Sequence, residues 1–351
     1  MNNKLIRTVR ILIFIIIAGF AGVVVIRNTQ PAPIEKQENQ GGLEEQLHPL
    51  SIEYIRQQAY PGSEITIEQM LPSGSNYNQY IASYKSDGLK IYALLTVPQS
   101  AKPKNGWPVI IFNHGFMPPD QYRTTERYVA YVDVFARNGY IVFKSDYRGH
   151  GNSEGKAEGG YCSNAYTIDV LNALSSMKKY KDTDPNRIGM WGHSMGGGIT
   201  LRSMVVSKDI KAGVIWAGVV GSYSDLLNNW KRRDLSRGET GIPHWATSWR
   251  QRLIDQYGEP SKNPEFWNSI SANSYLNDIS GPIQLHHAKN DSHVPFSFSE
   301  KLNSQLQEVS KTVEFYSYED DDHNLTNSFD TAMERSIEFF DKYLKGSEVE
   351  S

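Results

Sequence analysis

Short apolar runs alternate with longer amphipathic stretches from residue 109 to the end of the chain. The runs have the length of strands, and polar or glycine-containing residues follow each of them. Stretches with helical spacing of apolar residues lie between and after them, at 128–138, 165–180 and 329–344. This alternation predicts an α/β fold with a mostly parallel central sheet flanked by helices. The predicted strands are 109–112, 141–144, 188–191, 214–216, 283–287 and 313–316.

A different pattern precedes these runs. A short helix is predicted at 51–58, and strands are predicted at 65–70, 79–84 and 89–97. The last two strands are separated by Ser86-Asp87-Gly88, and an Asp-Gly pair favours a tight hairpin. The chain therefore begins its ordered part with antiparallel strands.

The first 27 residues stand apart, because residues 11–26 carry no charge and follow Lys4, Arg7 and Arg10. Sixteen residues span only ~24 Å of helix, so preceding apolar residues must extend the span toward the ~30 Å of a hydrocarbon core. Valines after the small residues 18–22 disfavour a cleavage site, so we expect an uncleaved anchor; cleavage would make the protein secreted. The leading basic residues predict a cytoplasmic N-terminus with the bulk of the chain outside, in a bacterial envelope.

The remainder divides into a polar tether at 28–50 and one domain at 51–346. Within the domain, residues 221–280 separate two predicted strands by far more chain than a strand connection needs. This insertion holds four of the seven tryptophans, and it is either a helical cap over a substrate pocket or a helical excursion with its own small core.

Composition narrows the function classes. With 39% hydrophobic residues and 28 glycines, the chain is neither disordered nor a protein of many membrane spans. A formal charge of −3 provides no basic field for a nucleic acid. The single cysteine, Cys162, excludes an internal disulfide and a cysteine-based zinc or iron–sulfur site.

One segment has the pattern of a catalytic turn. The predicted strand 188–191 leads into Gly192-His193-Ser194-Met195-Gly196, and residues 199–206 have helical spacing. Where a G-x-S-x-G segment lies between a strand and a helix, the serine occupies a strained turn that tolerates only glycine at the neighbouring positions. Residues 151–155 also match G-x-S-x-G, but without a strand and a helix around them, so Ser153 is expected to be a loop serine.

Ser194 needs a base and an acid to act as a nucleophile. His323 follows the predicted strand 313–316, and Asp291 follows the predicted strand 283–287. Alone, the first would be a solvated histidine and the second a turn residue. Together with the glycine-rich turn, three residues at the carboxyl edge of one sheet, in the order Ser-Asp-His, predict a catalytic triad.

The strand at 109–112 runs into His114-Gly115-Phe116, a loop that would carry one oxyanion donor. We expect the backbone N–H groups of Met195 and Phe116 to form the oxyanion hole. His114 and His193 are expected to have structural roles. The segment after the next strand contains Asp146 and Arg148, which are expected to brace the loop beside the pocket.

A metal site is the competing interpretation of His286, His287, Asp291 and His293. Adjacent residues on a strand face opposite sides of the sheet, so the two neighbouring histidines cannot bind one ion. We therefore expect no metal.

From about residue 84 to 344 the chain resembles the catalytic domain of prolyl oligopeptidase-type serine hydrolases, within the α/β-hydrolase superfamily. The resemblance is carried by YKSDGLKIYALLTVP at 84–98, FARNGYIVFKSDYRGHG at 135–151, and residues 185–198 and 285–295. It implies cleavage of peptide bonds or carboxylic esters through an acyl-enzyme, without metal or organic cofactor. Fewer than sixty residues separate Ile26 from Tyr84, too few for the β-propeller of the typical oligopeptidase.

The expected function is thus a membrane-anchored serine hydrolase, with a serine-type peptidase favoured by the resemblance. A carboxylesterase acting on small acyl esters is the alternative, because the His114-Gly115-Phe116 loop is closer to the esterase form than to the tyrosine-bearing loop of oligopeptidases. An inactive hydrolase-fold binding protein is a remote third. The expected partners are an ester or a short peptide and a membrane, with no nucleic acid.

Overall fold

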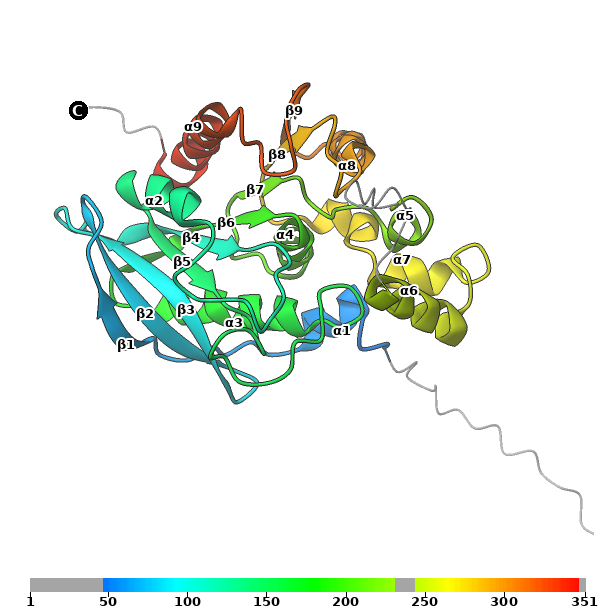
Figure 1. Cartoon of the computed structure of the whole chain (residues 1–351), viewed down its shortest axis with the longest axis horizontal. Coiled ribbons are helices and arrows are strands. Elements are labelled where there is room, and N and C mark those ends of the chain that lie inside the picture. Colours follow the sequence, from blue (N-terminus) through cyan, green and yellow to red (C-terminus); the bar gives the residue numbers. More distant parts are fainter. Residues whose placement is uncertain (1–46, 231–243, 347–351) are drawn as a thin grey trace, which may run out of the picture. The chain divides into compact units, whose positions relative to one another are not determined.

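The computed structural model describes residues 47–230 and 244–346, with the side chains of helix α6 described from Trp249 onward. Its centre is a nine-stranded sheet of order β1-β2-β3-β5-β4-β6-β7-β8-β9 (Figure 1). The strands are β1 (Thr66–Leu71), β2 (Tyr77–Ser86), β3 (Leu89–Pro98), β4 (Trp107–Asn113), β5 (Ile141–Ser145), β6 (Thr183–His193), β7 (Gly213–Trp216), β8 (Ile283–Ala288) and β9 (Val313–Tyr318).

The sheet joins an antiparallel part to a parallel part. β1, β2 and β3 pair antiparallel, and β3 pairs antiparallel with β5. The remaining pairs, from β5 through β4 to β9, are parallel. Between β2 and β3, Asp87 and Gly88 have φ of 49° and 79°, as a tight hairpin turn that follows the strand twist requires. The predicted α/β fold class and all nine predicted strands are confirmed.

Helices cover both faces because strand residues alternate between them. Ile111 and its β6 partner Met190 pack into one hydrophobic cluster, together with residues of α1 (Ile52–Gln57), α3 (Ala165–Lys179), α4 (Met195–Val206) and α8 (Phe296–Glu308). The next pair, Phe112 and Trp191, packs on the other face with α2 (Val129–Arg137) and α9 (Phe329–Phe340). Each fully buried side chain of this size contributes about 1.5–3 kcal/mol, so the two clusters hold the strand ends in fixed register.

The described residues of the insertion between β7 and β8 are mostly helical (Figure 1). It contains α5 (Tyr223–Asn228), α6 (His244–Tyr257), α7 (Pro264–Ile270) and a 3-10 helix over Ala272–Asp278. A capping box starts α5, and Asn263 followed by proline starts α7. Trp230, Trp249 and Trp267 are buried in the same hydrophobic cluster as α4.

The expected membrane localisation is corrected. A spanning helix needs about 20 apolar residues, whereas α3, the longest described helix, has 15 residues and a length of ~22 Å. No helix within 47–230 and 244–346 is long and apolar enough to cross a membrane. The expectation of a single-pass protein with its N-terminus in the cytoplasm is wrong on this finding. The anchor expected at 1–27 and most of the expected tether lie outside the described residues.

Candidate active site

Ser194 lies on a sharp turn between β6 and α4. Its φ of 56° and ψ of −119° are unfavourable for a residue with a side chain, and such strain persists only where the surroundings enforce it. Here its N–H donates to the carbonyl of Trp216 at 3.0 Å, and its carbonyl accepts from Val219 at 2.9 Å. A Cβ on Gly192 would lie 2.4 Å from a backbone oxygen of α4, and one on Gly196 would lie 2.0 Å from a backbone oxygen of β4. The strand, turn and helix predicted around Ser194 are therefore present.

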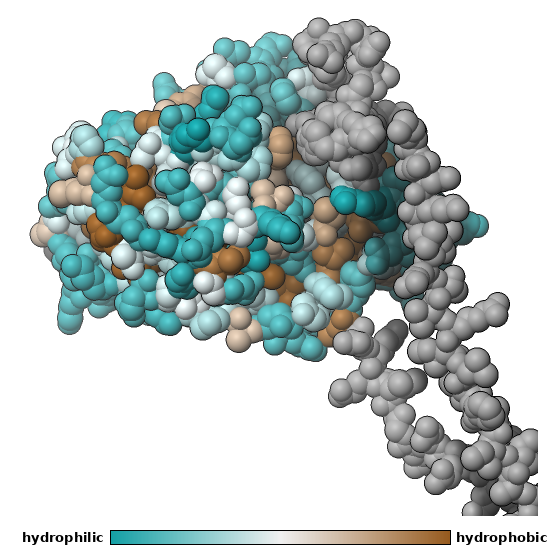
Figure 2. All heavy atoms as spheres, turned by 60° about the horizontal axis from the view of Figure 1, so that its bottom comes forward, coloured by the Kyte–Doolittle hydropathy of each residue, from teal (hydrophilic) through white to brown (hydrophobic). Residues whose placement is uncertain are grey.

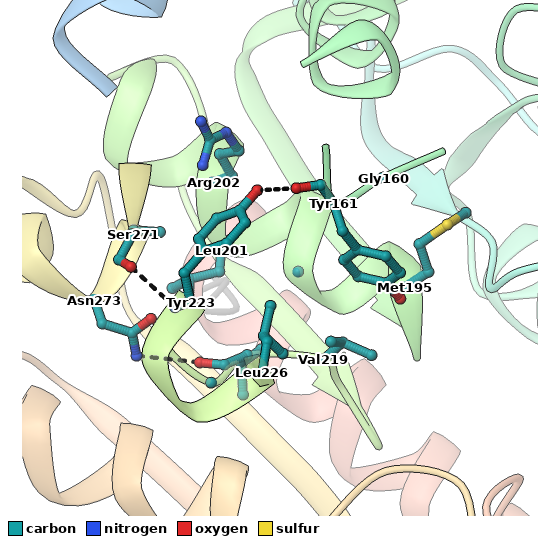
Figure 3. A pocket seen from close by; sticks show the side chains of 14 residues that line it. Gly160, Tyr161, Met195, Leu201, Arg202, Val219, Tyr223, Leu226, Ser271 and Asn273 are labelled. Atoms are coloured by element: carbon teal, nitrogen blue, oxygen red, sulfur yellow. Dashed lines mark hydrogen bonds between the residues drawn. The ribbon is translucent and has the colours of Figure 1, made fainter. Parts of the chain in front are cut away.

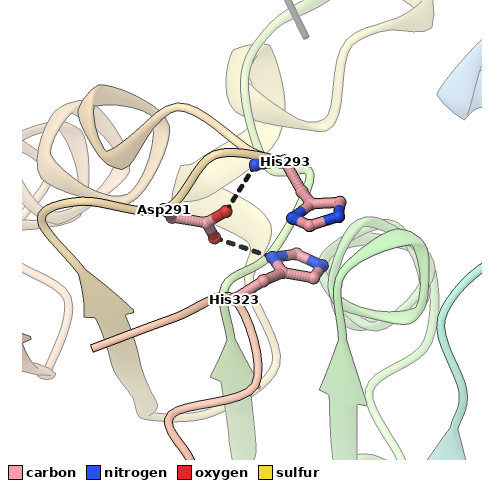
Figure 4. A group of neighbouring side chains, drawn as sticks. All are labelled: Asp291, His293 and His323. Atoms are coloured by element: carbon pink, nitrogen blue, oxygen red, sulfur yellow. Dashed lines mark hydrogen bonds and ion pairs between the residues drawn. The ribbon is translucent and has the colours of Figure 1, made fainter. Parts of the chain in front are cut away.

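The structure brings the predicted acid and base together at the same edge of the sheet (Figure 4). Asp291 lies in the loop after β8, and His323 lies in the loop after β9. Their atoms Oδ2 and Nδ1 are 2.7 Å apart, and the carboxylate is fully buried. The other carboxylate oxygen accepts the backbone N–H groups of His293 and Val294 at 2.7 and 3.1 Å. The loop after β8 thus orients the acid toward the histidine.

Electrostatics keeps Asp291 ionised. Burial alone would raise the pKa of its carboxyl, but hydrogen bonds from His287 and His323 hold that pKa well below its usual range. An ionised carboxylate can only accept, so Nδ1 of His323 carries the proton that it donates to Asp291. In the neutral ring Nε2 is then left as an acceptor, which is the state that a general base requires.

Two backbone segments adjoin Ser194. The N–H of Met195 belongs to the first turn of α4, where the helix dipole favours negative charge. A Cβ on Gly115 would be 3.2 Å from Cβ of Ser194, so the loop after β4 passes directly beside the serine. The Gly115 N–H donates to the Tyr128 hydroxyl at 3.0 Å and is therefore engaged. Phe116 is the next residue of this loop.

The other serine and histidine candidates are placed differently. Ser153 lies in the turns between β5 and α3, where its Oγ accepts the N–H of Tyr92 at 2.9 Å. His114 is fully buried between the rings of Tyr122 and Tyr147, at centroid distances of 4.6 and 4.2 Å. Burial lowers the pKa of His114 to about 3, so the ring is neutral.

Asp146 and Arg148 do brace the segment after β5. Burial raises the pKa of Asp146 to about 6, and its carboxyl accepts the hydroxyls of Tyr122 and Thr124 at 2.9 and 2.5 Å. The guanidinium of Arg148 binds the buried Asp169 at 2.7 Å. Among the described residues, neither side chain forms a hydrogen bond with Ser194.

The two adjacent histidines of β8 face opposite sides of the sheet, as expected. His286 bonds the Tyr318 hydroxyl at 2.8 Å and lies against the ring of Trp216. His287 instead contacts Asp291. The atoms of Asp291, His293 and His323 that could bind a metal lie within 4.8 Å of one another. Two of these three side chains, Asp291 and His323, are joined directly by the 2.7 Å hydrogen bond.

Sequence reasoning missed two residues of the site. His287 places Nε2 3.1 Å from Oδ2 of Asp291, and its Nδ1 is 2.7 Å from Oγ of Ser299. The signal was a histidine four residues before the acid, at the end of a strand. Tyr128 places its hydroxyl 2.7 Å from Nδ1 of His193, and no sequence pattern pointed to it.

Two cavities meet at Met195. The larger, of about 270 Å³, is lined by residues that include Phe116, Tyr161 and Trp249. The smaller, of about 50 Å³, lies between α4 and the start of the insertion, where the Tyr223 hydroxyl donates to the carbonyl of Tyr161 (Figure 3). Both are bounded by the insertion and by the segment between β5 and α3.

Comparison with known proteins agrees with this architecture. The uncharacterized peptidase YtmA of Bacillus subtilis (strain 168) is 25% identical over 260 residues, which cover 72% of this chain and 90% of that protein. The lysophosphatidylserine lipase ABHD12 of Danio rerio is 27% identical over 259 residues, covering 68% of this chain and 61% of that protein. The uncharacterized peptidase YuxL of Bacillus subtilis (strain 168) is 26% identical over 247 residues, which cover 69% of this chain and 35% of that protein, so the chain spans about a third of that relative.

Solved structures show the same fold. The acylaminoacyl peptidase of Pyrococcus horikoshii superposes with a TM-score of 0.62 at 22% identity, over 79% of this chain and 44% of that one. The acetyl xylan esterase of Paenibacillus sp. R4 superposes with a TM-score of 0.63 at 18% identity, over 82% of this chain and 91% of that one. The fold is therefore an α/β-hydrolase fold.

The family assignment rests on a longer match. The profile of the prolyl oligopeptidase family matches residues 127–347, more than half of the chain, and this range includes Ser194, Asp291 and His323. The chain belongs to the prolyl oligopeptidase family and is an enzyme, a serine hydrolase.

Proposed function

We propose that this hydrolase acts through Ser194, His323 and Asp291. The Ser194 Oγ attacks the substrate carbonyl carbon while Nε2 of His323 takes its proton, and Asp291 holds the imidazolium in place. The N–H groups of Met195 and Phe116 bind the oxyanion. The carbon–nitrogen or carbon–oxygen bond then breaks, and His323 returns the proton to the leaving amine or alcohol. Water, deprotonated by His323, releases the acid and restores the serine.

One observation carries this proposal: a serine on a strained strand-to-helix turn shares a sheet edge with an aspartate and a histidine bonded at 2.7 Å. The proposed steps use side chains and backbone groups of this chain and require no metal or organic cofactor. The proposed substrates are short peptides and esters.

Between the two bond types, we propose a serine-type peptidase, in keeping with the family and with the peptidases among its relatives. A carboxylesterase is the second candidate. Two observations favour it: the His114-Gly115-Phe116 loop, and a fold match that covers 91% of an acetyl xylan esterase.

The insertion at 221–280 is proposed to be the cap of the catalytic domain at 51–346. Trp249 of α6 lines the cavity beside Met195, and Tyr223 of α5 lines the smaller one. Residues of the insertion therefore bound both cavities next to the proposed oxyanion hole, where they decide which substrate groups fit.

A fluorophosphonate probe tests the nucleophile. The probe should label the wild-type protein, and Ser194→Ala should abolish labelling. The matched control is Ser153→Ala, which removes the serine of the other G-x-S-x-G segment and should leave labelling intact. Labelling that persists in Ser194→Ala, or that is absent from the wild type as in an inactive relic, contradicts the proposal.

A paired substrate test separates the two bond types. Turnover of aminoacyl and prolyl 4-nitroanilides is compared with turnover of 4-nitrophenyl esters of the same acyl groups. A peptidase cleaves both series, because amide cleavage is the harder reaction of the shared mechanism. Esters cleaved with anilides untouched would assign the chain as a carboxylesterase.

A further inference from the structure

The larger cavity has aromatic walls. Its volume of about 270 Å³ is bounded by rings from three separate parts of the chain: Phe116 after β4, Tyr161 and Tyr166 around the start of α3, and Trp249 in α6. The rings of Tyr161 and Trp249 are stacked at 5.5 Å, and Tyr166 is stacked on a buried tyrosine of the domain core at 5.0 Å. Stacked neighbours hold these rings in place, so the cavity has a defined shape.

Size separates this cavity from its neighbour. A cavity of about 150 Å³ with apolar walls is enough to bind benzene. The larger cavity, at about 270 Å³, therefore has room for a phenyl ring, and the smaller one, at about 50 Å³, does not.

Among the described residues, the charged side chains on the larger cavity's wall are one acid, Glu158, and one base, Arg252. Their charges balance, so the wall favours an uncharged group. Met195 and Phe116, whose N–H groups are assigned to the oxyanion, also line this cavity. A group bound there lies next to the reacting carbonyl.

We propose that this cavity takes an aromatic or similarly bulky uncharged group of the substrate, attached directly at the scissile bond. The proposal rests on the proposed function of Ser194. The proposal distinguishes this chain from an enzyme built for small groups on both sides of the scissile bond, which would leave the cavity unfilled.

Three esters test the proposal: ethyl acetate, ethyl 3-phenylpropionate and benzyl acetate. They place a phenyl ring on neither side, on the acyl side or on the leaving side of the bond. Burial of a phenyl group should raise kcat/KM of one aromatic ester about 10- to 100-fold over ethyl acetate. Trp249→Ala should remove most of that preference and Trp249→Phe should keep most of it.

Equal kcat/KM for the three esters in a protein whose Ser194 is labelled by the fluorophosphonate overturns this proposal and leaves the proposed function standing. Absence of Ser194 labelling overturns both. Fluorophosphonate labelling of Ser194 therefore distinguishes the two failures.

The chain's single cysteine offers a readout that does not depend on turnover. Cys162 lines the same cavity. In Ser194→Ala, saturation with the preferred aromatic ester should slow alkylation of Cys162 by iodoacetamide at least about fivefold, while ethyl acetate should not. Alkylation unaffected by the aromatic ester contradicts binding in this cavity, even if Trp249→Ala fails to fold.

A second inference comes from a chain of hydrogen bonds behind the serine. Nε2 of His193 lies 2.9 Å from the backbone carbonyl of His323. A carbonyl only accepts, so Nε2 carries the proton, and burial lowers the pKa of His193 to about 3, so the ring is neutral. Nδ1 must then accept, and its donor is the Tyr128 hydroxyl at 2.7 Å. The phenol oxygen in turn accepts the Gly115 N–H at 3.0 Å.

These bonds connect the two halves of the site. They run from Gly115, next to Phe116 in the oxyanion loop, through Tyr128 and His193 to the backbone of His323. Because each of these hydrogen bonds has a fixed direction, together they constrain where the oxyanion loop lies relative to the loop that carries the base.

The fold also holds Tyr128 under strain. Arg127 and Tyr128 have consecutive positive φ values of 57° and 54°, which residues with side chains rarely adopt. The fully buried Lys144 of β5 donates to the carbonyls of Glu126 and Arg127 at 3.0 and 3.3 Å. Strain of this kind persists where the surrounding structure enforces it.

We infer that Tyr128 and His193 are positioning residues that couple the oxyanion loop to the base loop; this too rests on the proposed function. Tyr128→Phe should lower kcat about 10- to 100-fold with KM nearly unchanged, because a small misplacement of a catalytic group costs rate rather than binding. Affinity for an aryl boronic acid, which mimics the tetrahedral intermediate, should fall by a similar factor.

A double-mutant comparison separates this role from simple stabilisation. If Tyr128 and His193 act as one chain, Tyr128→Phe combined with His193→Leu should lose no more rate than the larger single change. Tyr140→Phe is the control: its buried hydroxyl bonds Asp341 away from the site, and its loss should affect stability and leave kcat unchanged. Independent, multiplying losses, or a kcat of Tyr128→Phe within twofold of the wild type, overturn the inference.

Discussion

Replacement of Asp291 by the isosteric asparagine should destabilise the fold as well as the reaction. Both carboxylate oxygens face donors: Oδ2 receives His323 and His287, and Oδ1 receives the N–H groups of His293 and Val294. An amide has one oxygen and one NH₂ group, so in either orientation its NH₂ group faces one of the two pairs of donors. With the NH₂ group toward the histidines, His323 can change tautomer and accept from it, whereas Nε2 of His287 also donates to the Val294 carbonyl and stays a donor. One unmade hydrogen bond then predicts a loss of about 1–3 kcal/mol in the free energy of unfolding.

The pH dependence of this loss has a definite sign. The folded pKa of Asp291 is depressed, so its ionised form stabilises the native state at every pH above the unfolded value of about 3.9. That contribution falls as pH drops further toward the folded pKa. The difference between wild type and Asp291→Asn should therefore be constant from pH 8 to about pH 5 and shrink below about pH 4.

Urea unfolding at several pH values measures the stability effect, and ester hydrolysis measures the catalytic one. The wrong tautomer of His323 should lower kcat about 10³- to 10⁴-fold. An Asp291→Asn protein whose unfolding free energy at pH 7 lies within about 1 kcal/mol of the wild type would refute the four-donor arrangement. So would a stability difference that is unchanged at pH 3.

Three further predictions follow from the same structure. Gly196→Ala should prevent folding or lower the free energy of unfolding by more than about 3 kcal/mol, because its Cβ would lie 2.0 Å from a backbone oxygen. Gly139→Ala is the control: its Cβ would meet open space, so the loss should be only ~1 kcal/mol. Thermal unfolding compares the two variants. His287→Leu should cost about 1.5–3 kcal/mol and lower kcat, because it removes a donor to ionised Asp291, and a variant as active and stable as the wild type would contradict that contact. Burial lowers the pKa of Lys144 to about 8, so the unfolded chain binds more protons than the folded one between pH 8 and pH 10. The unfolding free energy of the wild type relative to Lys144→Met should therefore rise over that interval. A difference that stays flat would show that the ammonium is not buried.

The surface offers little further guidance to partners. On the face shown in Figure 2, hydrophilic residues dominate and apolar residues form small separate groups. Among the described residues, the most exposed large apolar side chains include Met70 in β1 and Val129 at the start of α2, which lie on different elements. Phe116 is also exposed, at 44%, and it differs from these in lining the aromatic cavity beside the proposed oxyanion hole.

The strands and the serine turn could be predicted because their signals are local. A two-residue alternation is written into each strand, as in Ile111 and Phe112, which the structure places in different cores. The turn at Ser194 needs glycine at fixed neighbouring positions, so the same few residues carry both the requirement and the signal. The order of the three predicted catalytic residues followed from strand ends alone, since parallel strands end at one edge. The membrane localisation inferred from the apolar N-terminal stretch was wrong, because no helix among the described residues is long and apolar enough to cross a membrane.

The contacts that tune the site could not be read from the sequence. His287 and His193 are two of nine histidines, and which of them touches Asp291 or the backbone of His323 depends on how β8, the serine turn and the loop after β9 are stacked. Tyr128 reaches Gly115 only because a strained turn, held by a buried lysine, directs it there. The sequence by itself determined the sheet, the turn and the order of the predicted triad, since these depend on near neighbours in the chain. Tertiary structure decided the hydrogen-bond partners and the aromatic cavity, because these join segments that only packing brings together.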